Sequence, residues 1–139
     1  MRKTIFTLLA VLMPLIAAAQ SHRPFDVTIS NEEYKIYIRM NLHDKNLTVP
    51  GQSVLGEVDG YIASTQSRST WIIISSEITG ENTARIDVVN DYGSEDFTAE
   101  VKLNKDGTYS YKKLDGSTLK FAVKGKWQKI PGSLTFIRK

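Results

Sequence analysis

The amino-acid sequence predicts an all-β fold, a small antiparallel meander of about seven to eight strands that forms a closed or nearly closed barrel. From residue 34 onward, apolar residues recur at every second position, which places them on one face of extended strands. Turn-forming Gly, Pro, Asn and Asp separate these runs at short, regular intervals. A β-sandwich is the alternative, because a period of two fixes the pleat of a strand but not its partners.

The beginning of the chain is typical of a signal peptide over residues 1–19. Residues 1–3 are positively charged, residues 5–16 are mostly apolar, and residues 17–19 are the small alanines that a signal peptidase cuts. Residues 5–19 would form about 22 Å of helix, which is too short for a hydrocarbon core of roughly 30 Å. We therefore expect an exported protein, periplasmic or secreted, with no membrane span.

The remaining chain divides into a lead-in and one domain. Residues 20–33 contain Pro24 and scattered apolar residues, which indicates a flexible lead-in or a short edge strand. Residues 34–139 are expected to form a single β-barrel-like domain, beginning with an alternating strand over residues 34–42. Residues 71–74 are apolar on both faces, which favours a strand covered on both sides or one with an aromatic ring outside.

Two hairpin signals lie in the second half of the domain. Asp106-Gly107 and Asp115-Gly116 each separate alternating runs, which predicts a three-stranded meander over residues 95–124. An eight-stranded barrel is only just wide enough for its own side chains or one small ligand. The large residues predicted to point inward are Tyr34, Ile36, Ile38, Met40, Leu42, Ile72, Ile74, Ile86, Val88, Phe97, Val101, Leu103, Tyr109, Tyr111, Leu119, Phe121, Val123, Leu134 and Phe136. We expect them to fill the interior.

The composition excludes several kinds of chemistry. The chain has no Cys, which excludes a thiol nucleophile, a Cys-ligated zinc and disulfide exchange. Residues 20–100 hold 6 basic and 13 acidic residues, whereas residues 101–139 hold 10 basic and 2 acidic ones. This asymmetry indicates a surface for an acidic partner or, in the interpretation we favour, acidic and basic strands that lie side by side.

Catalytic and metal-binding patterns are few. His22 and His43 have no zinc spacing, and the expected place of His43 is a solvated turn. The acidic residues Asp87, Asp91, Glu95 and Asp96 do not follow the spacing of a calcium loop, and a turn explains residues 90–93. We expect no metal, no cofactor and no enzymatic activity.

Aromatic residues are the candidate ligand-binding positions. Tyr109 and Tyr111 lie two residues apart on one strand face, where they form either a platform for a sugar or part of the core. Trp71 and Trp127 are further candidates. Gly125-Lys126-Trp127, followed by Arg138, resembles a fragment of the calycin or lipocalin-like pattern, in which a Trp at the base of the barrel packs under an Arg. In that family the Gly-x-Trp triplet lies on the first strand and the Arg on the last, whereas here both lie in the last fifteen residues.

These patterns support two hypotheses on function. The first is an exported, non-enzymatic binding module that contacts a protein or glycan of the cell envelope through its outer surface or loops, and not nucleic acid. The second, which the resemblance implies, is a lipocalin-like carrier of a small apolar ligand. A filled interior favours the first, because a carrier needs an internal cavity.

Overall fold

The computed structural model describes residues 22–139, so the predicted signal peptide lies outside the described residues. The described chain forms strands and turns, without a helix that is long and apolar enough for a membrane crossing. The strands are β1 (Asp26–Asn31), β2 (Ile36–Asn41), β3 (Leu47–Thr48), β4 (Glu57–Val58), β5 (Gly60–Ser64), β6 (Thr70–Ile78), β7 (Thr83–Asn90), β8 (Asp96–Leu103), β9 (Tyr109–Gly116), β10 (Lys120–Val123), β11 (Lys126–Lys129) and β12 (Ser133–Arg138).

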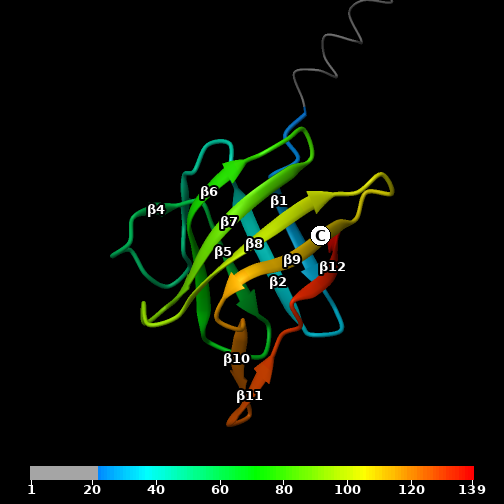
Figure 1. Cartoon of the computed structure of the whole chain (residues 1–139). Coiled ribbons are helices and arrows are strands. Elements are labelled where there is room, and N and C mark those ends of the chain that lie inside the picture. Colours follow the sequence, from blue (N-terminus) through cyan, green and yellow to red (C-terminus); the bar gives the residue numbers. More distant parts are fainter. Residues whose placement is uncertain (1–21) are drawn as a thin grey trace, which may run out of the picture.

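Eight of these strands close into an antiparallel barrel in the order β1-β12-β9-β8-β7-β6-β5-β2 (Figure 1). The chain winds around the barrel from each strand to its neighbour and leaves it twice, to form the small sheets β3–β4 and β10–β11. Pairing of β1 with both β2 and β12 completes the closure. The predicted meander barrel is confirmed, and the sandwich alternative is wrong.

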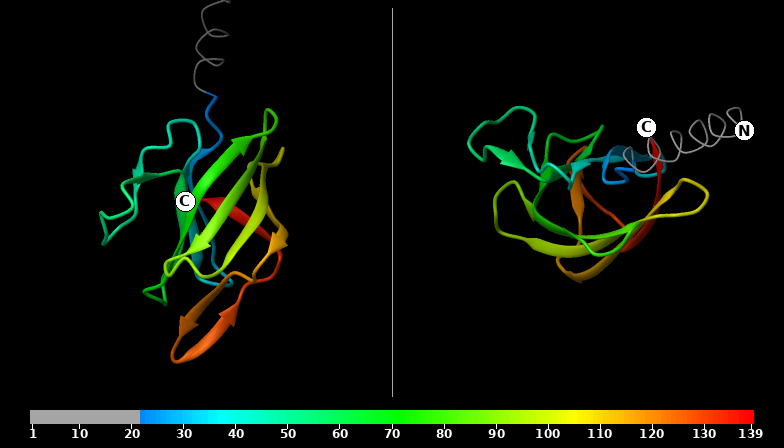
Figure 2. Two further views of the ribbon diagram at one scale, coloured as in Figure 1. Left: turned by 60° about the vertical axis from the view of Figure 1, so that its left-hand side comes forward. Right: turned by 90° about the horizontal axis from the view of Figure 1, so that it is seen from above.

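Alternate connections meet at the same end of the barrel, because neighbouring strands are antiparallel. Turns at residues 32–35, 65–69 and 91–95 lie at one end together with β10–β11, and we call this the hairpin end. The hairpin projects from the barrel in Figures 1 and 2. The β6–β7 and β8–β9 turns lie at the opposite end, the N-terminal end, where Pro24 leads into β1.

Large side chains fill the interior and close both ends. Phe25 is fully buried near the N-terminal end, and Leu119, Phe121 and Ile130 from the hairpin segment belong to the same core. Their burial stabilises the fold by about 1.5–3 kcal/mol for each large side chain. The predicted inward residues are confirmed on every strand except β6.

On β6, the side chains that point inward are Trp71 and Ile73, not Ile72 and Ile74. Ile72 packs outside the barrel against Val49 and Val58, and Ile74 is 55% exposed at a bulge in the β6–β7 pairing. The strand is covered on both sides near Ile72, as one alternative predicted. Four consecutive apolar residues give no alternation, so the sequence does not indicate which pair faces inward.

The predicted lead-in over residues 20–33 is wrong from β1 onward. β1 pairs with β2 along its whole length, from Asp26 opposite Asn41 to Asn31 opposite Ile36. Its partner on the other side is β12, so it is not an edge strand either. The domain therefore begins before residue 34. Phe25, Val27 and Ile29 alternate with polar residues and are buried, so the pattern of a strand is present in the sequence next to Pro24.

The predicted three-stranded meander over residues 95–124 is wrong in its second turn. β8 and β9 form the expected hairpin, but the chain leaves the barrel after Gly116, and β10 pairs with β11 instead of β9. The turn of this second hairpin is Lys124-Gly125, with φ values of 52° and 77°. Gly116 is needed because the backbone of β8 passes close to it: an added Cβ would lie 2.5 Å from the carbonyl oxygen of Asp96.

Candidate functional site

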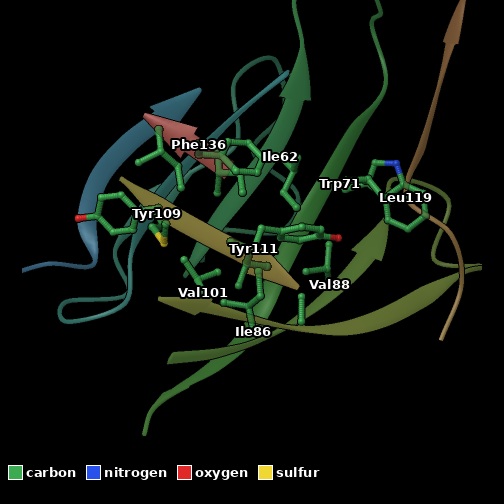
Figure 3. Close-up of a cluster of buried hydrophobic side chains, with 14 of the residues drawn as sticks. Ile62, Trp71, Ile86, Val88, Val101, Tyr109, Tyr111, Leu119 and Phe136 are labelled. Atoms are coloured by element: carbon green, nitrogen blue, oxygen red, sulfur yellow. The ribbon is translucent and has the colours of Figure 1, made fainter. Parts of the chain in front are cut away.

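The two tyrosines predicted as a possible platform belong to the core. Tyr109 and Tyr111 are 0% and 2% exposed, and Figure 3 shows them among the other inward-pointing side chains. Burial raises the pKa of Tyr111 far above its usual value. The Tyr109 hydroxyl donates to the carbonyl oxygen of Pro24 at 2.6 Å and accepts from Arg138 Nη2 at 3.1 Å. Neither ring offers a face to the outside.

Trp71 is also buried, and it joins the barrel to the projecting hairpin. Its ring packs at 5.5 Å from the ring of Phe97, and its Nε1–H donates to the carbonyl oxygen of Lys120 at 3.0 Å. A buried indole N–H needs such a partner. Because Lys120 is the first residue of β10, this hydrogen bond fixes the base of the hairpin against the barrel wall.

Trp127, in contrast, is 61% exposed on β11. Lys120 Nζ lies 4.8 Å from the centroid of its ring and 3.5 Å from the carboxylate of Glu95. A cation over an indole face is a favourable arrangement that restricts the ring. The structure thus brings Trp71 and Trp127 together around Lys120, one inside the barrel and one outside it.

A flap formed by β3, β4 and their loop covers part of the outer wall. Val49 and Val58 pack on Ile72 of β6, which holds the flap against the barrel. The loop beyond Val49 carries Val54, 94% exposed, and Leu55, 49% exposed. These two apolar side chains face solvent close to the hairpin end, since they line the same pocket as Arg68 of the 65–69 turn and Asp91 of the 91–95 turn.

One pocket beside the flap and another beside β10–β11 adjoin at the turn of residues 91–95, and we call the two together the hairpin-end groove. It comprises a pocket of about 400 Å³ and a notch of about 30 Å³ that share Asp91. The pocket is lined by Val49, Pro50, Gln52, Val54, Leu55, Arg68, Thr70, Ile72 and Asp91. The notch is lined by Ser69, Trp71, Asn90, Asp91, Tyr92, Glu95, Lys120 and Trp127.

Exposed apolar side chains are concentrated at this groove. Among residues 22–139, eight large hydrophobic residues are exposed, and four of them line the groove: Val54, Leu55, Tyr92 and Trp127. Only Trp127 was predicted from the sequence. Tyr92 was assigned to a turn, and nothing in the sequence distinguishes an exposed apolar loop residue from a covered one.

The histidine and acidic residues that the sequence offers for catalysis or metal binding do not form a cluster. His43 lies at the N-terminal end, where its Nε2 accepts a hydrogen bond from the backbone N–H of Phe25 at 3.1 Å. The predicted turn is confirmed, but the expectation that His43 is merely solvated is wrong. Asp87 accepts hydrogen bonds from Ser75 and Thr98. Within residues 22–139, no three His, Asp or Glu side chains are placed to hold a metal ion.

The resemblance to the lipocalin-like pattern does not extend to its packing. Trp127 lies exposed on the hairpin, whereas Arg138 contacts Tyr109 near the N-terminal end. Gly125 forms the turn of β10–β11. Comparison with known proteins gave no match: no protein-family model, no curated protein and no solved structure corresponds to this chain.

Proposed function

We propose that the protein is an exported binding module that holds a glycan chain of the cell envelope in the hairpin-end groove, outside the barrel. The observation that carries the proposal is the concentration of exposed apolar side chains there, from Val54 on the flap to Trp127 on the hairpin. Exposed apolar side chains gathered at one end of a protein mark interaction sites, and aromatic residues are enriched in such sites.

The shape of the groove favours a glycan. A sugar ring stacks flat on an aromatic side chain, so Trp127 and Tyr92 need no deep pocket between them, and the notch beside them measures only about 30 Å³. The adjoining pocket of about 400 Å³ lies within the range of small-ligand sites, roughly 300–1,000 Å³. Arg68 and Asp91 in its lining supply donors and acceptors that suit sugar hydroxyls.

The packing of the barrel supports an outer site over an internal carrier site. Aromatic rings span the interior in contact with one another, with centroid distances of 6.4 Å from Phe97 to Tyr111 and 6.0 Å from Tyr111 to Phe136. A ligand carried inside the barrel would have to displace these side chains. Repacking a filled core costs about 1–3 kcal/mol or more.

The test is a binding screen of the purified protein against immobilised polysaccharides, both neutral and anionic. Trp127→Ala should abolish or strongly weaken whichever binding is found. Ile137→Ala is the matched control, because Ile137 is 53% exposed on β12, across the barrel from β6. Absence of binding to every polysaccharide, or binding that survives Trp127→Ala, would overturn the proposal. Binding of a purified envelope protein at the groove, without binding of any polysaccharide, would contradict the proposal that the ligand is a glycan.

A further inference from the structure

We propose that the glycan held in the hairpin-end groove is anionic and that the β10–β11 hairpin selects it by charge, an inference that rests on the proposed function. The hairpin is strongly basic. Residues 120–129 contain four lysines, Lys120, Lys124, Lys126 and Lys129, and no acidic residue. Four of the ten basic residues in residues 101–139 therefore lie on one element, which projects from the barrel (Figure 1) and contributes Lys120 and Trp127 to the notch.

Most of this charge lacks an internal partner. Lys120 pairs with Glu95 at 3.5 Å, but no salt bridge within residues 22–139 involves Lys124, Lys126 or Lys129. Lys120 and Lys129 are direct cross-strand partners. Like charges directly opposite one another destabilise a sheet. An anion bound beside the hairpin would relieve this repulsion.

One of these cations, Lys129, is placed to act together with the aromatic ring. Lys129 follows Trp127 by two residues on β11, so both side chains point to the same face of the hairpin. A sugar stacked on the indole would thus carry its acidic group, or that of the next residue in the chain, toward the Lys129 ammonium. Lysine binds such groups as a flexible point charge.

The tip of the hairpin argues against a lipid surface as the partner. A segment that enters a bilayer interface presents apolar side chains to it. Here the tip is Lys124-Gly125-Lys126, and the exposed Trp127 lines the notch with Tyr92. At the hairpin itself an acidic peptide fits less well than a sugar, because peptide partners anchor side chains in pockets and the notch that Trp127 lines measures only about 30 Å³.

The experiment compares the binding of polygalacturonate with that of its fully methyl-esterified form, which keeps the sugar chain and removes the charge. We expect the esterified form to bind at least about tenfold more weakly, and polygalacturonate binding to weaken as salt is raised. The double variant Lys126→Glu/Lys129→Glu should lose binding by at least about tenfold. Lys102→Glu/Lys105→Glu is the control: it reverses two exposed lysines at the N-terminal end and should change affinity less than about twofold. Thermal unfolding of each variant verifies that it is folded.

The outcomes separate the two proposals. Equal binding of the charged and esterified chains, lost in Trp127→Ala, would overturn selection by charge and leave the groove as the glycan site. No binding of any polysaccharide would overturn both. If poly-glutamate or vesicles containing phosphatidylglycerol bind as tightly as polygalacturonate, or if Trp127→Ala leaves polygalacturonate binding intact, the inference of an anionic glycan is wrong.

Discussion

Replacing Gly116 with Ala tests the close approach of β8 and β9 at the point where the chain leaves the barrel. Gly116 has a φ of +97°, and an added Cβ would lie 2.5 Å from the carbonyl oxygen of Asp96 and 2.6 Å from the Cα of Phe97. Both are backbone atoms, so no side-chain rotation relieves the contact. Gly107 is the matched control, because its φ is +88° and nothing lies within 4 Å of an added Cβ.

The two substitutions share one cost and differ in another. A left-handed backbone costs a residue with a Cβ about 1–2 kcal/mol at either position. Forcing the chains apart at Gly116 adds an overpacking cost of about 1–3 kcal/mol. We therefore expect Gly116→Ala to lower the free energy of unfolding by about 2–5 kcal/mol, and Gly107→Ala by about 1–2 kcal/mol. Urea unfolding followed by far-ultraviolet circular dichroism measures both, and equal losses would show that the close approach of β8 adds no cost at Gly116.

Two further predictions concern the N-terminal end. Tyr109→Phe removes the hydroxyl that links Pro24 and Arg138 and should lower the free energy of unfolding by about 1–3 kcal/mol in urea titrations; an unchanged stability would contradict a role for this link. Burial lowers the pKa of His43 from 6.5, so the unfolded chain takes up a proton first as the pH falls. This contribution to stability is complete above about pH 6.5 and is lost from there down to the lowered folded pKa. His43→Asn should show a smaller fall in unfolding midpoint between pH 7.5 and pH 5 than the unaltered protein; an identical pH dependence would show that His43 does not act in this way.

The barrel could be predicted because local chemistry and the global fold agree along most of the chain. In β8, Phe97, Ala99 and Val101 alternate with polar residues, and all three are buried. A period of two leaves such a strand only one way to face the core. The same rule gave most of the residues that fill the interior.

Prediction failed where a residue had two compatible roles. Asp115-Gly116 has the composition of a hairpin turn, but the glycine is needed for contact with β8. Lys124-Gly125 forms the actual turn, although its first residue is a lysine at positive φ. Which glycine forms a turn depends on the approach of a strand that is distant in sequence, and short-range patterns do not contain this information.

The candidate site was predicted in only one of its exposed residues. Trp71, Tyr109 and Tyr111 are core residues, and only Trp127 faces the groove from outside. Aromatic residues serve cores and binding surfaces alike, so residue type alone does not separate the two roles. The groove lies where two departures from the barrel attach to neighbouring residues of β6, the flap at Ile72 and the hairpin at Trp71.

A two-dimensional NMR titration with tetragalacturonate distinguishes binding outside the filled barrel from binding inside it. The chain has two tryptophans, so the two indole N–H signals distinguish the exposed Trp127 from the buried Trp71. We expect the largest shifts at the Trp127 indole and at backbone amides of residues 91–95 and 120–129. Amides of the inward residues Ile38 and Ile62 should remain unchanged. Shifts concentrated at these inward residues, or no shifts at all, would contradict binding outside the barrel.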